Sequence, residues 1–70
     1  MVWYECQDTI GLPEVTRDVE LLIKPEDLPF KYLSVVWDGK NLWFYSNNER
    51  SPWDTLHKTV HFKEWAYIVD

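Results

Sequence analysis

An Asp-Gly pair between two runs of β-favouring residues constrains the fold of this chain more than any other feature. The pair is Asp38-Gly39, and residues 30–45 around it are rich in Tyr, Val, Trp, Leu and Phe. Two such runs joined by Asp-Gly predict a β-hairpin with a two-residue turn. The sequence therefore predicts two antiparallel strands in which each side chain faces a defined partner.

This turn divides the hairpin into two faces, because successive side chains of a strand point to opposite sides of a sheet. The pairs expected on the first face are Trp37/Lys40, Val35/Leu42 and Leu33/Phe44. The pairs expected on the second face are Val36/Asn41, Ser34/Trp43 and Tyr32/Tyr45. Tyr and Trp combine a large apolar area with a polar tip, so the first face is interpreted as core and the second as a candidate docking surface.

The rest of the chain predicts an all-β fold with minor α content. Besides the hairpin, strands are expected at residues 2–6, 17–24 and 59–69. Residues 47–50 are polar and predict a loop, and Ser51-Pro52 has the layout of a helix start, which predicts one short helical turn over 52–57. We expect a single domain over residues 1–70, built as a twisted antiparallel sheet of about five strands that curls towards a small barrel.

Two of the expected strands carry informative patterns. In the strand over 17–24, alternation places three aliphatic residues on the core side, namely Val19, Leu21 and Ile23. In the strand over 59–69 the apolar pattern changes phase between Phe62 and Trp65. A β-bulge near Lys63-Glu64 would restore one apolar face, so a bulge is predicted there.

The composition indicates a small core that relies on aromatic rings. Twelve of the 70 residues are Trp, Tyr or Phe, and a domain of this size buries only about 60% of the surface that its unfolded chain exposes. We therefore expect Trp3, Trp37 and Trp65 to be core residues. The single cysteine, Cys6, fits a reducing compartment. No secretory segment or membrane span is recognisable, so a soluble, cytoplasmic protein is expected.

The negative charge is concentrated in the first part of the chain. Residues 1–27 contain seven acidic and two basic side chains, which account for the whole net charge of −5. This balance argues against direct binding of nucleic acid, which requires a basic surface to neutralise phosphates. It is compatible with docking to a basic surface on another protein.

Catalytic and metal-binding motifs are not recognisable. His57 and His61 are the two histidines, and with Cys6 they do not complete the four ligands of a closed zinc site. No serine lies in a nucleophile motif, and Gly11 and Gly39 are too far apart for a phosphate-binding loop. The sequence therefore predicts neither an enzyme nor a bound metal or cofactor.

The order of several short motifs along the chain resembles one family. These motifs are Trp3, Leu12-Pro13-Glu14, Asp18-Val19-Glu20-Leu21, Trp37-Asp38-Gly39 with Trp43, and Trp65 in a terminal strand. Their order and spacing are similar to those of a family of small phage and prophage domains of unknown function, family 551. The resemblance implies a compact β fold and a phage origin, and it implies no chemistry.

These observations together favour a phage-derived acidic protein that binds and inhibits a host protein. The expected target is a nucleic-acid enzyme or an anti-phage defence complex, as for anti-CRISPR or anti-restriction proteins, acting in the host cytoplasm. The partner-binding residues predicted are aromatic anchors and steering acids, namely Tyr32, Trp43, Tyr45, Trp53, Glu20, Glu26 and Asp27.

Two alternative functions stay open at this point. The aromatic residues could stack on a planar ring in a small-ligand or nucleotide-binding β domain. The protein could instead be a homo-oligomeric accessory protein, for example a homodimer formed through the hairpin edge. Trp53 lies in a predicted turn, so it could either close one end of the fold or project as an anchor.

Overall fold

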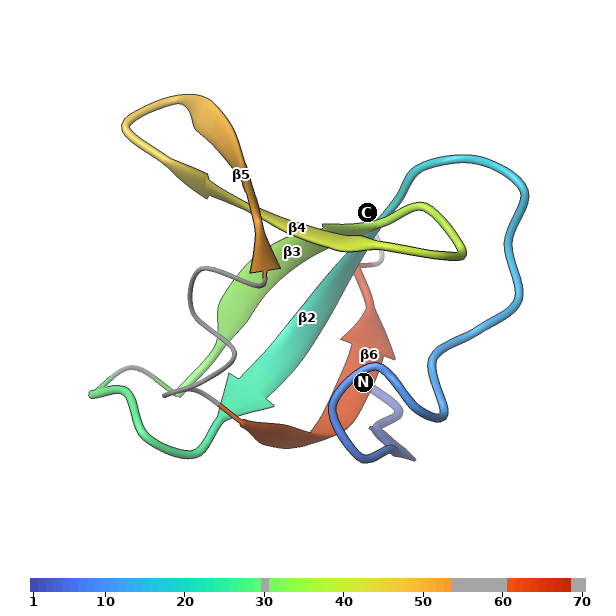
Figure 1. The fold of residues 1–70 in the computed structure, drawn as a ribbon. Coiled ribbons are helices and arrows are strands. Elements are labelled where there is room, and N and C mark those ends of the chain that lie inside the picture. Colours follow the sequence, from blue (N-terminus) through green and yellow to red (C-terminus); the bar gives the residue numbers. More distant parts are fainter. Residues whose placement is uncertain (30, 54–60, 69–70) are drawn as a thin grey trace.

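The computed structural model describes residues 1–29, 31–53 and 61–68, and in this part of the chain it shows one antiparallel sheet (Figure 1). The six strands are β1 (Tyr4–Glu5), β2 (Val19–Pro25), β3 (Leu33–Trp37), β4 (Leu42–Ser46), β5 (Glu49–Pro52) and β6 (Phe62–Tyr67). Their order in the sheet is β1-β6-β2-β3-β4-β5. The predicted all-β class is confirmed, although the described sheet is open, with β1 and β5 at its edges, and does not close into a barrel.

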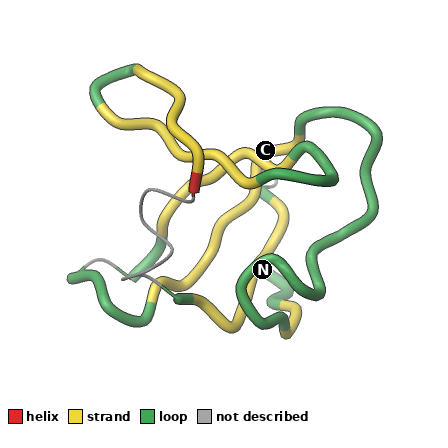
Figure 2. The backbone as a smooth tube through the Cα atoms, in the orientation of Figure 1, coloured by secondary structure: helices red, strands yellow, loops and turns green. Residues whose placement is uncertain are grey.

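One face of the sheet carries the hydrophobic core. The alternation predicted for the second strand is confirmed, because Leu21 and Ile23 are fully buried and Val19 packs against the core. The buried cluster consists of Leu21, Ile23, Val35, Trp37, Leu42, Trp53, Phe62 and Trp65. Figure 2 shows that the described chain is made almost entirely of strands and the loops that join them.

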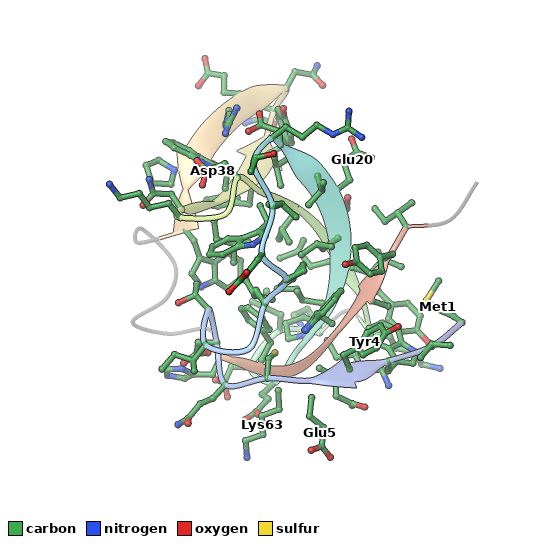
Figure 3. All side chains as sticks on the ribbon, turned by 90° about the vertical axis from the view of Figure 1, so that its right-hand side faces the viewer. Met1, Tyr4, Glu5, Glu20, Asp38 and Lys63 are labelled. Carbon is green, nitrogen blue, oxygen red and sulfur yellow. The ribbon has the colours of Figure 1, made fainter. Side chains whose placement is uncertain are left out.

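The long segment between β1 and β2 covers this core. In Figure 3 it runs across the front of the sheet, with side chains packed between. Two core tryptophans hold it in place: the indole N–H of Trp37 donates to the carbonyl of Pro13 at 2.7 Å, and that of Trp65 donates to the carbonyl of Gly11 at 3.0 Å. These hydrogen bonds satisfy both indoles within the core and fix the covering segment to the sheet.

The bulge predicted in the last strand is confirmed. Ile23 pairs with Trp65 and Pro25 pairs with Phe62, so three steps along β6 match two steps along β2. The extra residue lies at Lys63-Glu64, where the apolar pattern changes phase. Phe62 and Trp65 are both buried as a result. The predicted strand began at residue 59, which lies outside the described residues.

The turn of the central hairpin differs from the prediction. The observed pairs are Trp37 with Leu42, Val36 with Trp43 and Val35 with Phe44, so the predicted register is wrong by two residues. The reason is Asp38, whose Oδ1 accepts the backbone N–H groups of Lys40 and Asn41 and closes a four-residue loop. A shift of two residues leaves every side chain of the two strands on its predicted face, whereas Lys40 and Asn41 lie in the loop.

The two-residue turn lies instead at Asn47-Asn48. Both asparagines have positive φ angles, 53° and 66°, as a type I′ turn requires. This turn leads into β5, where Tyr45 pairs with Arg50 and Trp43 pairs with Pro52. The predicted loop over 47–50 is therefore confirmed only for its first two residues, and Ser51 and Pro52, the predicted helix start, belong to β5. Trp53 has 3-10 helical geometry, and residues 54–57 of the predicted helical turn lie outside the described residues.

Candidate functional site

The face of the sheet opposite the core, here called the outer face, is the candidate site. Strand alternation and register place on it Glu20, Leu22, Lys24, Ser34, Val36, Trp43, Tyr45, Arg50, Pro52, Glu64 and Ala66. Trp43 and Tyr45, two predicted anchors, therefore share this face, as their positions two residues apart on β4 require.

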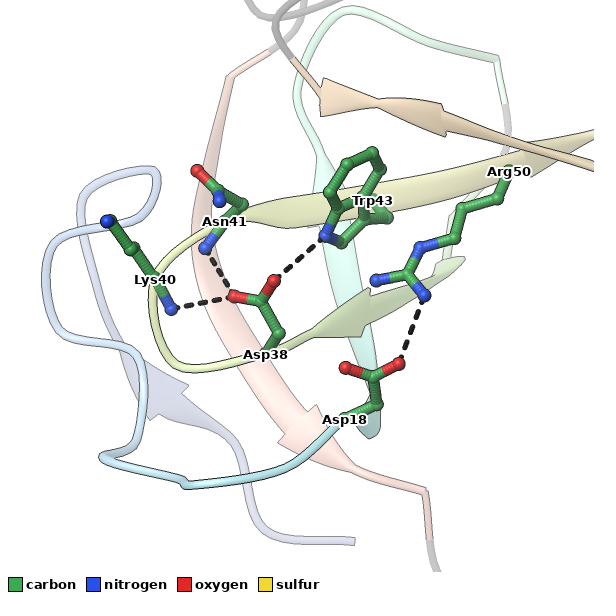
Figure 4. A network of polar contacts seen from close by, with 6 residues as sticks. All are labelled: Asp18, Asp38, Lys40, Asn41, Trp43 and Arg50. Carbon is green, nitrogen blue, oxygen red and sulfur yellow. Dashed lines mark hydrogen bonds and ion pairs between the residues drawn. The ribbon is translucent and has the colours of Figure 1, made fainter.

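Asp38 and Arg50 hold the indole of Trp43, one at its N–H group and the other on the face of its ring (Figure 4). Its indole N–H donates to Oδ2 of Asp38 at 3.1 Å. The guanidinium of Arg50 lies over the indole, 4.4 Å from the ring centroid, and Nη1 of Arg50 donates to Oδ2 of Asp18 at 3.0 Å. The half-buried ring is thus fixed before any partner binds.

Tyr45 is the most exposed aromatic side chain on the outer face. Its exposed fraction is 56%, and its cross-strand neighbour is Arg50, the residue that lies over Trp43. A fixed indole next to an open tyrosine is the composition typical of an interface anchor, because Trp, Tyr and Arg dominate binding hot spots. This pair, supported by Arg50, forms the centre of the candidate site.

Tyr32 belongs to a second aromatic cluster. It stacks on Trp3 with ring centroids 5.5 Å apart, while the ammonium of Lys24 lies 4.2 Å from the Trp3 centroid and pairs with Glu64 at 3.3 Å. The prediction that Trp3 is a core residue is wrong, because its ring is half-buried against Tyr32. The predicted Tyr32/Tyr45 pair is not formed.

Trp53 is a core residue, so its prediction as a partner-binding anchor is wrong. Its exposed fraction is 3%, and its ring makes edge contacts with Phe44 at 6.2 Å and Phe62 at 5.6 Å. The physical reason is β5, which the sequence analysis missed. Pro52 pairs with Trp43 on the outer face, so alternation turns the next residue towards the core.

The three predicted steering acids do not form one patch. Glu20 lies on the outer face opposite Val36, near the start of β2. Glu26 and Asp27 follow the other end of that strand, about 20 Å away at the usual rise per residue. The carboxylate of Glu26 also pairs with Lys63 at 3.7 Å. Of the three, only Glu20 adjoins the candidate site.

Three charged residues of the site were not predicted as site residues, namely Asp18, Asp38 and Arg50. The contact between Arg50 and Asp18 joins positions 32 residues apart, a distance that no local pattern reveals. Arg50 alone could have been found, because an Asn-Asn hairpin turn places it opposite Tyr45.

Cys6 and His61 are of side-chain types that bind metals or act as nucleophiles and bases. Among the described residues, no group of three or more His, Cys, Asp and Glu side chains is placed to hold a metal ion. His61 instead contacts Asp8, with 3.2 Å between Nδ1 and Oδ2, and His57 lies outside the described residues. Burial, followed by the charges of Asp8 and Glu64, raises the pKa of the Cys6 thiol to about 11. Cys6 is therefore a weak nucleophile at neutral pH.

These features define the class of the molecule as a small all-β domain with a fixed aromatic and charged outer face. No family model matches the chain, and neither a curated protein nor a solved structure is significantly similar to it. Within the described residues, no helix is long and apolar enough to cross a membrane.

The carboxylate of Asp38 organises the loop next to Trp43, and this gives a testable pH dependence. Hydrogen bonds from the backbone of Asn41 and Lys40, then from the Trp43 indole, lower the pKa of Asp38 below its ordinary 3.8. Because folding lowers this pKa, the charged carboxylate stabilises the folded state at pH values above 3.8. That stabilisation is lost as the pH falls through the lowered pKa of the folded protein. Wild type should therefore unfold at a higher temperature than Asp38→Asn near neutral pH, and the gap should close in acid.

Thermal unfolding followed by circular dichroism across the acidic range measures this difference. Asp27→Asn, at an exposed aspartate beyond β2, is the matched control and should show no such gap. A gap for Asp38→Asn that stays constant down to the lowest pH would contradict the role given to the charge.

Proposed function

We propose that this protein acts by binding another protein through the outer face around Trp43 and Tyr45. The observation that carries the proposal is the open tyrosine beside an indole that Asp38 and Arg50 already hold in place. Anchors fixed in advance lose little side-chain entropy on binding, so more of their contact energy appears as affinity. Residues of this type supply most of the binding energy at many interfaces.

The charge of the chain favours a partner with a basic surface. The net charge is −5, Glu20 is exposed beside the site, and Asp18 engages the neighbouring cation Arg50. Glu26 and Asp27, at the far end of β2, add to the long-range negative potential. Such a field accelerates association with a positively charged partner and is weakened by salt.

The edge strands of the sheet favour a partner that contacts side chains over a partner that pairs a strand of its own with the sheet. The edge strand β1 has two residues, and the edge strand β5 has four and ends at Pro52. Short edges that carry charge or proline are poor templates for pairing with another chain. This argument also disfavours a homodimer formed through the hairpin edge.

The sequence resemblance to phage and prophage domains makes a bacterial host protein the proposed partner. A nucleic-acid enzyme or an anti-phage defence complex exposes a basic groove for its own ligand. An acidic protein docked there would block nucleic acid and inhibit the host protein, as an anti-CRISPR or anti-restriction protein does.

The proposal is tested by affinity capture from a bacterial lysate at two salt concentrations, with mass spectrometry of the captured species. We expect one nucleic-acid-processing protein, captured less well at high salt, and a loss of capture of at least about tenfold for Tyr45→Ala. The matched control is Ile10→Ala, at a side chain that is 74% exposed in the turn over residues 7–10. Equal capture by both variants, or capture of no protein by the folded wild type, would refute the proposal.

A further inference from the structure

One guanidinium group, that of Arg50, already lies on the ring face of Trp43. It is 4.4 Å from the centroid of the indole, and its Nη1 donates to Oδ2 of Asp18 at 3.0 Å. Arginine stacks on aromatic rings and donates several hydrogen bonds from one plane, so an indole face next to a carboxylate is a suitable site for a guanidinium. The surface around Trp43 therefore has the chemistry of an arginine-binding site, and the chain fills it with its own residue.

The contact that Arg50 makes is open to exchange. Arg50 lies on the edge strand β5, where its side chain is 35% exposed, and the side chain of Asp18 is 55% exposed. An ion pair between exposed side chains contributes little to stability, because water screens the charges and ordering the side chains costs entropy. The advantage of Arg50 over an arginine from outside is mainly its tether, which corresponds to an effective concentration on the order of millimolar.

The charge of the surroundings favours a further cation. Alternation along the start of β2 places Asp18 and Glu20 on the same face, about 7 Å apart at the usual rise per residue. Glu20 is exposed and has no ion pair among the described residues. The carboxylate of Asp38 lies at the indole N–H, while the side chain of Lys40 points away from the ring (Figure 4). A guanidinium from outside would thus meet carboxylates that Arg50 alone does not neutralise.

We infer that the partner presents an arginine that takes the place of Arg50 over the Trp43 indole and pairs with Asp18. The inference rests on the proposed protein-binding function and names the chemistry of its central contact. Asp38 holds the indole N–H throughout, and a guanidinium covers the ring before and after the exchange, so the ring stays fixed. Proteins that bind nucleic acid expose arginines of this kind where they contact phosphates.

The test uses Nα-acetylarginine amide as the probe and Nα-acetyllysine amide for comparison. Arg50→Ala opens the site, so in this ¹⁵N-labelled variant the arginine probe should shift the indole N–H resonance of Trp43 saturably and leave those of the core residues Trp37 and Trp65 unmoved. Wild type should need at least about tenfold more probe, because Arg50 competes. The lysine probe should bind at least about fivefold more weakly, because its ammonium is not planar.

Matched variants separate the site from general effects of charge. Arg17→Ala, at the other arginine of the chain, which is exposed, should respond to the probe as wild type does. Asp18→Asn in the Arg50→Ala background should weaken probe binding at least about tenfold, whereas Asp27→Asn, at an exposed aspartate beyond the far end of β2, should leave it unchanged. Circular dichroism shows that each variant is folded.

The outcomes distinguish this inference from the proposed function. No saturable shift in Arg50→Ala, an equal response to both probes, or equal affinity in Arg50→Ala and wild type would overturn the inference. If the probe fails while Tyr45→Ala still loses capture from the lysate, the protein-binding function stands and the arginine contact is wrong. A shift of the Trp43 resonance on concentrating the protein alone would assign the site to an arginine of a second copy and overturn the choice of partner.

Discussion

Replacing Trp53 by alanine should lower the free energy of unfolding by about 3–5 kcal/mol, the cost usual for removing a large buried ring. The ring is 3% exposed and lies between Phe44 and Phe62, so its loss leaves a cavity in the centre of the core. Urea denaturation followed by circular dichroism measures the change, and the expected result is a large fall in the transition midpoint with an unchanged slope.

Tyr45→Ala is the control for this measurement, because both residues were predicted as anchors from the sequence. Tyr45 is 56% exposed, so its truncation should cost less than about 1 kcal/mol, the upper range of a cross-strand pair. Similar costs for the two variants, or a small cost for Trp53→Ala, would contradict the division between a buried Trp53 and an open Tyr45.

The sequence predicted the faces of the central hairpin better than its turn. Faces depend on whether a position is odd or even along a strand, and a register shift of two residues preserves that parity. The turn type depends on local hydrogen bonds, and the side chain of Asp38 competes with a two-residue turn by accepting two backbone N–H groups. This competition cannot be read from the Asp-Gly pair alone.

The position of Trp53 depended on a strand that the sequence analysis missed. The polar run over 47–50 predicts a loop, yet the two adjacent asparagines in it also supply the left-handed backbone of a tight hairpin turn. Once β5 is formed, parity places Arg50 on the outer face and Trp53 in the core. Because this turn was missed, Arg50 was left out of the candidate site and the buried Trp53 was included in it.

The bulge in β6 was predictable because its evidence is local. The apolar pattern changes phase between Phe62 and Trp65, and both residues can face the core if the strand contains one extra residue between them. The contacts that complete the site are not local: Arg50 reaches Asp18, and Trp37 reaches Pro13. Such contacts depend on how the segment between β1 and β2 folds over the sheet, and no periodicity encodes that path.

Gly39→Ala should destabilise the fold by about 2–4 kcal/mol, because it combines an unfavourable backbone conformation with a collision. The φ angle of Gly39 is +94°, a region that residues with a Cβ rarely adopt. A Cβ at this position would also overlap the backbone carbonyl oxygen of Val15, in the segment that covers the core. Relief would require the hairpin loop and this segment to separate, which chemical denaturation would record as a lower midpoint.

Gly11→Ala separates the two contributions to that cost. Gly11 has a similar φ angle, +102°, but the nearest atom to its added Cβ would be the Cα of Cys6 at 3.1 Å, a tight contact without overlap. The expected cost is about 1–2 kcal/mol, mainly from the backbone conformation. The excess for Gly39→Ala then measures how firmly the covering segment is held against the hairpin. Equal costs would show that this segment moves aside easily, although Trp37 ties it to the sheet through the Pro13 carbonyl.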